Sequence, residues 1–155
     1  MSASLAWQLA RFRELDVDSL YDLLALRAEV FVVEQRCAYA DPDGKDRHPD
    51  AWHLLGRDAD GVLVAYLRML PPGLSFDEAS FGRVVTAPSQ RGRGVGDALV
   101  IEALKHMARA WPRSDIRIGA QAHLVGYYGK HGFVVASDEY LEDDIPHRDM
   151  LRCAG

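Results

Sequence analysis

The chain has 155 residues and is 48% hydrophobic, which is enough to bury a substantial core in a single domain over residues 1–155. Its net charge of -5 argues against broad nucleic-acid binding, so any anion site must come from a local basic cluster. No apolar run approaches the length of a membrane span, and the N-terminal residues lack the features of a signal peptide. We therefore expect a cytoplasmic protein with no membrane partner. Cys37 and Cys153 are interpreted as free thiols, with a disulfide as the alternative.

The first half of the chain is predicted to begin with a strand over residues 5–12. A helix follows, which Asp18 or Ser19 can cap, because leucines recur at helical spacing from Leu20 onwards. The apolar run 30–33 is interpreted as a continuation of this helix. After a polar, turn-rich stretch, residues 51–57 and 62–70 are predicted to form a hairpin around an Asp-Ala-Asp-Gly turn.

The second half is predicted to alternate strands and helices. A strand is expected over residues 81–87, and helical spacing then runs from Ala98 until Trp111-Pro112. The remaining predicted elements are a strand over 116–120, a helix over 123–131, and an antiparallel pair formed by 133–140 and 147–153. This order predicts an α/β fold, in which a mixed sheet of about seven strands has helices on both faces.

A basic, glycine-rich turn joins the 81–87 strand to the following helix. Its sequence is Arg91-Gly92-Arg93-Gly94-Val95-Gly96, so its backbone N–H groups are bare and lie at the positive end of a helix dipole. Two arginines add full charge, and this combination is typical of a pyrophosphate site. The spacing differs from the dinucleotide-binding G-x-G-x-x-G, and Gly96-Asp97 replaces the Gly-Lys-Ser/Thr of a P-loop. The alternative is a plain tight turn whose arginines face solvent.

Two motifs in order along the chain carry a family resemblance. Arg91, Gly94 and Gly96 match the turn Gln/Arg-x-x-Gly-x-Gly/Ala, and Tyr128 begins a match to Tyr-x-x-x-Gly-Phe that ends at Gly132-Phe133. On both motifs the chain resembles the GNAT superfamily of acyl-CoA-dependent N-acetyltransferases, over nearly its whole length. The segments 27–37, 41–46 and 140–147 further resemble the ElaA-like subgroup. The resemblance implies a twisted, mostly antiparallel sheet that is splayed in the middle.

The resemblance also implies how the co-substrate, acetyl-CoA, is bound. It assigns the pyrophosphate to backbone N–H groups of the turn, and the pantetheine arm to the main chain of the preceding strand, with Gln121 at a position where many members have asparagine. No metal is expected. The implied coenzyme A-binding residues are Val84, Val85, Thr86, Arg91, Gly92, Arg93, Gly94, Val95, Gly96 and Gln121.

Tyr128 matches the residue that the family commonly uses as general acid toward the coenzyme A sulfur. A phenol with an unperturbed pKa of about 10 stays protonated at neutral pH, as this role requires. The alternative is an aromatic packed in the core with its hydroxyl satisfied. Tyr127 lies about 100° further round the helix and is the better core candidate.

No general base is singled out by the sequence. His53, His123, Glu34, Glu78 and His147 are all chemically competent. Glu34 and His147 are favoured as possible bases because they lie in the subgroup-like stretches that flank the expected acceptor cleft.

Two acidic stretches are weighed as ligand sites. Asp41-x-Asp43-Gly44-x-Asp46 suggests calcium, but its glycine is at position 4 and position 12 is Trp52, unlike an EF-hand. It is interpreted as an acidic turn at the acceptor entrance, or as a solvated one. His48 and His53 lack further ligands for zinc. The run 142–144 is interpreted as a solvated turn, with attraction of a cationic amine as the alternative.

The sequence thus predicts an acetyl-CoA-dependent N-acetyltransferase. The acceptor is expected to be a primary amine of a small molecule, peptide or protein, which attacks directly in a ternary complex. The alternative is a non-catalytic acyl-CoA-binding sensor or partner-regulating module. No nucleic-acid partner is expected, and the oligomeric state is left open between a monomer and a homodimer.

Overall fold

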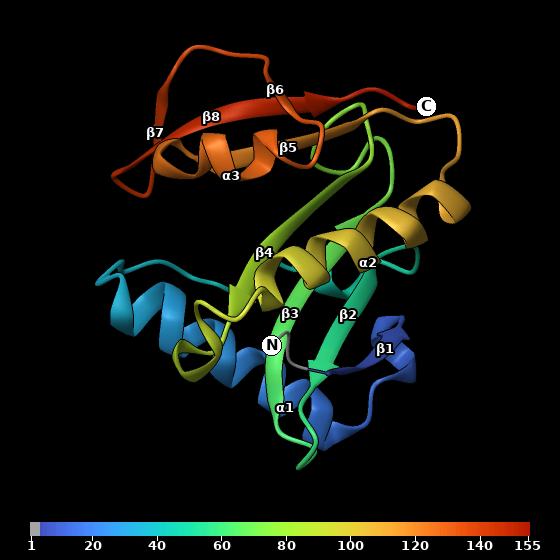
Figure 1. Cartoon of the computed structure of the whole chain (residues 1–155), viewed down its shortest axis with the longest axis vertical. Coiled ribbons are helices and arrows are strands. Elements are labelled where there is room, and N and C mark those ends of the chain that lie inside the picture. Colours follow the sequence, from blue (N-terminus) through green and yellow to red (C-terminus); the bar gives the residue numbers. More distant parts are fainter. Residues whose placement is uncertain (1–3) are drawn as a thin grey trace.

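Two antiparallel sheets form the framework of the computed structural model, which describes residues 4–155 (Figure 1). The first sheet has the order β1-β2-β3-β4, and the second has the order β5-β8-β6 with β7 also pairing with β8. The strands are β1 (Ala6–Ala10), β2 (Trp52–Arg57), β3 (Leu63–Leu70), β4 (Ser80–Thr86), β5 (Ile116–Gln121), β6 (Val134–Val135), β7 (Tyr140–Glu142) and β8 (Ile145–Arg152).

The two sheets meet at one edge of each. A parallel bridge joins Ala79 to Ile116, and the Arg117 N–H donates to the Ala79 carbonyl at 2.9 Å. Within residues 4–155 no further ladder joins β4 to β5, so the two parallel strands diverge from this point toward their C-terminal ends. The expectation of a sheet splayed in the middle is confirmed, and Figure 1 shows β4 and β5 separating.

Helices cover both faces of the first sheet, as predicted. On one face, α1 (Val17–Arg27) packs Leu23 and Leu26 against Leu55 and Tyr66. The other face, with Leu54 and Leu67, is covered by α2 (Val95–Ala110), which crosses in front of β3 and β4 in Figure 1. Since both faces are covered, every residue of β3 is buried, which explains why the strand is apolar apart from Arg68.

The start of α1 differs from the prediction, and its continuation agrees with it. The cap is Asp16, whose carboxylate accepts from the Ser19 N–H at 2.7 Å, so neither Asp18 nor Ser19 is the capping residue. The apolar run 30–33 continues the helix as the π-helical η2 (Ala28–Glu34). Short 3-10 turns complete the connections, namely η1 (Phe12–Glu14), η3 (Lys45–Arg47), η4 (Pro88–Gln90) and η5 (Ala122–Leu124).

The C-terminal third departs most from the sequence prediction. The helix expected over 123–131 is split into η5 and the five-residue α3 (Val125–Gly129), in agreement with the low helix propensity of its two glycines. The strand expected over 133–140 is interrupted, and its two parts, β6 and β7, pair separately with β8. Asp143 and Asp144, both with positive φ, form the turn between β7 and β8. Within residues 4–155, each helix is too short or too polar to span a bilayer.

Candidate active site

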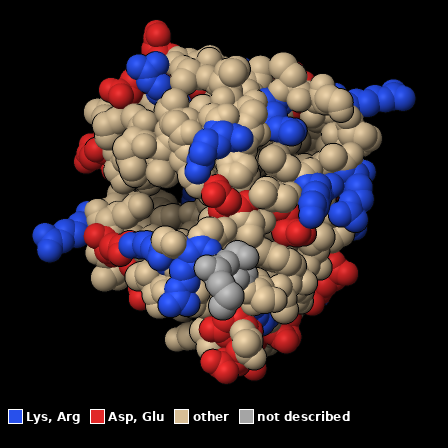
Figure 2. All heavy atoms as spheres, viewed as in Figure 1, with Lys and Arg blue, Asp and Glu red and all other residues tan. Residues whose placement is uncertain are grey.

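A cavity of about 630 Å³ lies where β4 and β5 diverge. Residues 80–84 of β4 form one wall and residues 118–121 of β5 form the other. The segment after α1 and the β7–β8 turn close it from two sides. The face in Figure 2 is hollowed between the upper and lower parts of the molecule, and side chains of both charge signs are interspersed on it. A volume of this size is typical of a small-molecule site.

A β-bulge shapes the β4 wall. Tyr66 pairs with Val85 and Arg68 with Gly82, so Arg83 and Val84 lie together opposite a single residue of β3. Arg83 adopts a left-handed conformation with φ 52°. A bulge bends its strand and releases backbone groups from the ladder, here at the edge of the cavity. Three residues of β4 were expected to bind coenzyme A. Val84 lines the cavity, Val85 is buried against α1 and Thr86 pairs with Ala65.

The glycine-rich turn precedes α2 as predicted, but its glycines have different roles. Gly92 and Gly94 have φ values of 78° and 75°, and an added Cβ at either would meet nothing within 4 Å. A Cβ on Gly96 would lie 2.9 Å from the Tyr127 hydroxyl, so this glycine makes room for that tyrosine. Val95 is in the core, and only its backbone is available to a ligand. Arg93 is exposed.

Arg91 is paired with an acidic side chain and is not an isolated arginine in solvent. Its guanidinium forms two hydrogen bonds with the carboxylate of Glu34, at 2.5 and 2.8 Å. The Arg91 hydrogen bonds lower the pKa of the Glu34 carboxyl. The structure therefore brings together two predicted site residues, although they were predicted for different purposes.

Tyr128 is 6% exposed and packs against Phe81 and Phe133 in the core. It also lines the cavity, and burial raises its pKa to about 12. Tyr127 is only partly buried and lies against the start of α2, so the expectation that Tyr127 is the better core residue is wrong. The missing Cβ of Gly96 explains the difference, because it gives the Tyr127 ring a place on the turn. Gln121 also lines the cavity, with Nε2 3.4 Å from Gln35 Oε1.

The candidate general bases differ in their surroundings. His53 is fully buried, its ring nitrogens lie 2.7 Å from the Tyr66 hydroxyl and 3.0 Å from the Asp46 carbonyl, and burial lowers its pKa. Glu78 pairs with Arg117, and His123 is exposed on η5. None of these three residues, nor Glu34, lines the cavity.

His147 is the remaining candidate, and it does line the cavity. Its Nδ1 lies 2.7 Å from the Ile145 carbonyl oxygen, which accepts only from a protonated nitrogen. The neutral ring therefore carries its lone pair on Nε2, which is 3.6 Å from a Glu142 carboxylate oxygen. The Tyr140 ring stacks on it with centroids 5.9 Å apart.

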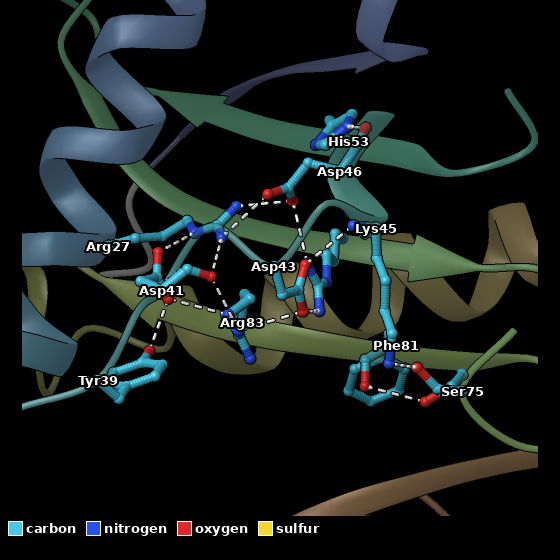
Figure 3. Close-up of polar contacts among 12 residues, drawn as sticks. Arg27, Tyr39, Asp41, Asp43, Lys45, Asp46, His53, Ser75, Phe81 and Arg83 are labelled. Atoms are coloured by element: carbon cyan, nitrogen blue, oxygen red, sulfur yellow. Dashed lines mark hydrogen bonds and ion pairs between the residues drawn. The ribbon is translucent and has the colours of Figure 1, made fainter. Parts of the chain in front are cut away.

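The acidic stretch after η2 is not arranged like a calcium loop, and two of its aspartates, Asp41 and Asp46, are buried and not solvated. Its aspartates form ion pairs with three arginines (Figure 3). Arg27 is fully buried between Asp41 at 2.7 Å and Asp46 at 2.9 Å, and Arg68 joins Asp46 to Asp43. Burial alone would raise the pKa of the Asp46 carboxyl, but the hydrogen bonds and charges of Arg27 and Arg68 hold it below its usual value. Among residues 4–155 no group of His, Cys, Asp or Glu could hold a metal ion.

Sequence reasoning missed this network and two further polar features of the cavity. The Tyr140 hydroxyl donates to Asp149 at 2.6 Å, and Lys45 Nζ donates to the Ser75 hydroxyl at 2.7 Å. One signal was available for the network, since Arg68 interrupts an otherwise apolar strand and a charge there requires a buried partner. Both cysteines are free thiols, as expected.

The chain belongs to the GNAT family of acetyltransferases, since a family model described as an acetyltransferase (GNAT) domain matches residues 44–152. This membership supports an acyltransferase enzyme over a non-catalytic binder. Within the family, the chain is 42% identical to the protein ElaA of Escherichia coli, over 94% of this chain and 95% of ElaA. The resemblance to the ElaA-like subgroup is thereby confirmed.

Solved structures agree with this assignment. An acyl-CoA N-acyltransferase from Pseudomonas aeruginosa matches with a TM-score of 0.92 and 45% identity, covering 97% of this chain and all of that one. The E. coli ElaA crystal structure matches with a TM-score of 0.90 and 41% identity, over 96% and 99% of the two chains. An aminoglycoside 6'-N-acetyltransferase complexed with coenzyme A shares the fold alone, with a TM-score of 0.71 and 16% identity over 95% and 97% of the chains.

Proposed function

We propose that the protein transfers the acetyl group of acetyl-CoA to a primary amine by direct attack in a ternary complex. The observation that carries the proposal is the cavity between the diverging strands, which places Tyr128 and His147 on the lining of one space. Holding both substrates there in the right orientation can lower the activation barrier of a bimolecular step by about 7–11 kcal/mol.

The residues around the turn fit the pyrophosphate of the donor. The sixteen-residue α2 directs its N-terminus at this place, and open, left-handed Gly92 and Gly94 leave backbone N–H groups accessible. Arg91 and Arg93 add charge, although Arg91 has to exchange Glu34 for the phosphate. A protein that shares this fold forms a complex with coenzyme A, which supports a coenzyme A thioester as the donor. The backbone of the β4 bulge and of Val84–Thr86 then faces the donor's arm and the thioester oxygen.

Tyr128 is proposed as the general acid. The amine attacks the thioester carbon, the C–S bond breaks, and the departing sulfur takes the phenolic proton. Since its pKa is raised to about 12, the phenol is fully protonated at neutral pH. No hydrogen bond of its hydroxyl to another described residue competes with this role.

His147 is proposed as the general base. Its Nε2 lone pair is fixed by the Nδ1–Ile145 contact, and it removes the proton that the attacking amine must lose. The nearby Glu142 carboxylate stabilises the imidazolium that results. An ammonium first releases one proton to solvent, and the neutral amine then attacks, so the proton taken by His147 balances the one given by Tyr128. Glu34 is not proposed as a base, because it is paired with Arg91 outside the cavity.

Thiol release from acetyl-CoA, measured across a panel of primary amines, tests the proposal. We expect release that depends on the amine, with an acetylated product detected by mass spectrometry. Tight coenzyme A binding with no release on any amine would support the sensor function instead and contradict the proposal.

A further inference from the structure

One wall of the cavity carries an uncompensated cation. Lys45 extends from η3 toward Ser75, and its ammonium donates to the Ser75 hydroxyl at 2.7 Å (Figure 3). Both residues line the cavity. The hydroxyl orients the ammonium without neutralising it, and no carboxylate of residues 4–155 lies within ion-pair distance of Lys45 Nζ.

The arginines beside Lys45 are already occupied. Arg27, Arg68 and Arg83 are paired with Asp41, Asp43 and Asp46, so this network of three cations and three anions is neutral as a whole. Asp43 also accepts from the Lys45 backbone N–H at 3.0 Å, which fixes the base of the lysine side chain. Lys45 is therefore the basic side chain of this wall that is left for a ligand.

The wall formed by the C-terminal sheet has the opposite charge. Glu142 and Asp143 line the cavity at the β7–β8 turn, and within the described chain neither forms an ion pair with a lysine or arginine. Asp149 also lines it and shares Arg117 with Glu78, so this cluster contains one cation for two anions. His147, the proposed base, lies on the same side.

We infer that the acceptor is a small amino acid, that is, a primary amine joined to a carboxylate by a short carbon chain. The carboxylate binds Lys45 and Ser75, and the amine lies toward His147 and the acidic β7–β8 turn. The inference rests on the proposed function and specifies its substrate class. An alkyl ammonium, with a pKa near about 10.4, arrives charged and is attracted to the acidic wall. The reverse orientation brings like charges together at both ends.

Other acceptors fit these charges less well. A diamine or a simple alkylamine leaves Lys45 without a counter-charge, and a diamine places a second ammonium beside it. A phosphate-bearing amine needs a cluster of free cations, whereas the neighbouring arginines are neutralised by aspartates. The cavity of about 630 Å³ must also admit the thioester end of the donor, which favours a small acceptor.

The test compares matched acceptors that differ only in the carboxylate. Acetyl transfer is measured for 4-aminobutyrate, 6-aminohexanoate and lysine against propylamine, pentylamine and cadaverine. The proteins are the wild type, Lys45→Met, Ser75→Ala and the control Lys105→Met, whose lysine is on the exposed face of α2. We expect at least one amino acid to have a KM about tenfold below that of its alkylamine, the factor typical of one charged hydrogen bond. Lys45→Met should abolish that difference without changing the KM of propylamine or pentylamine, Ser75→Ala should reduce it, and Lys105→Met should keep it.

Equal KM values for both acceptor classes in the wild type, or an equal change for both classes in Lys45→Met, overturn the inference while the proposed transfer stands. If no amine releases thiol, the proposed transfer fails, and calorimetry with the same acceptors and coenzyme A-saturated protein decides the inference separately. Binding of an amino acid that Lys45→Met abolishes then supports the carboxylate site, and the absence of such binding overturns it.

Discussion

The guanidinium of Arg91 and the carboxylate of Glu34 form a two-point pair, with Nη2–Oε1 at 2.5 Å and Nη1–Oε2 at 2.8 Å. The pair connects the end of η2 to the turn that is proposed to hold the pyrophosphate. Both side chains are about half-exposed, with 45% and 42% of their surface accessible. Under the proposed function this contact competes with phosphate for Arg91, so the affinity for coenzyme A would report a balance between two anions.

Removing the charge of Glu34 should therefore tighten coenzyme A binding. Because the pair is exposed and screened by solvent, Glu34→Gln is expected to lower the calorimetric Kd only by a factor of about three. Arg91→Ala should raise the Kd about tenfold, because a charge-assisted phosphate contact is lost. Glu102→Gln, on the exposed side of α2, serves as the control and should leave the Kd unchanged. An unchanged Kd in Arg91→Ala would remove the phosphate role.

The hydroxyl of Tyr128 should matter for turnover and not for folding. Tyr128→Phe is expected to lower kcat by a factor of about 10²–10⁴, the range of general acid catalysis, while the Kd for coenzyme A stays within about twofold. The melting temperature should change little, because the ring keeps its packing against Phe81 and Phe133. Tyr21→Phe, on the exposed side of α1, is the matched control. A kcat equal to that of the wild type would show that the sulfur takes its proton from another source.

The raised pKa of Tyr128 has a consequence at alkaline pH. A phenol with an ordinary pKa of about 10 loses its proton over the range 9–11. Burial raises the pKa of Tyr128 to about 12, so its protonated form persists across that range. Measured under saturating acceptor, kcat should therefore not fall from about pH 8.5 to 10.5. A fall in kcat centred near pH 10, with the protein still folded by circular dichroism, would mean that the acid is a more exposed group.

The elements with strong local signals were predictable from the sequence. The hairpin, α2 and the glycine-rich turn follow from apolar periodicity and from glycine spacing, and they stand where they were expected. The family motifs also pointed to Tyr128. The division of the last predicted strand into β6 and β7 could not be predicted from the sequence, because both strands are short and depend on pairing with β8.

The polar chemistry of the cavity was predicted less well, because it depends on contacts between distant residues. Glu34 is 57 residues from Arg91, and Arg68 is 25 residues from Asp43. Sequence spacing alone cannot show that the aspartates of the 41–46 turn belong to Arg27 and Arg68 and not to a cation or to solvent. The same holds for Lys45 and Ser75, which are 30 residues apart, since Lys45 begins η3 and Ser75 lies in the connection between β3 and β4.

The buried charge network should make the protein sensitive to acid. The arginines lower the pKa of the Asp46 carboxyl in the folded state, below its unfolded value of about 3.9. The carboxylate therefore contributes stability above that value, and the contribution is lost as the pH falls through the lower, folded-state pKa. Burial also lowers the pKa of His53 from 6.5, so the unfolded chain binds its proton first and stability already declines below about pH 6.5.

Replacing Asp46 tests the network directly at neutral pH. Asp46→Asn leaves the buried guanidiniums of Arg27 and Arg68 with one counter-charge fewer, and should lower the free energy of unfolding by about 3–5 kcal/mol. Asp22→Asn, which removes an exposed carboxylate from α1, should change it by less than about 0.5 kcal/mol. The measurement is urea unfolding at pH 7.5 and at pH 3.5. The difference in the free energy of unfolding between wild type and Asp46→Asn should shrink at the lower pH. There the unfolded wild-type chain binds a proton at Asp46, which lowers the stability of the wild type and not that of the variant. A difference that is small at pH 7.5 would mean that the two arginines keep enough counter-charge from Asp41 and Asp43 alone.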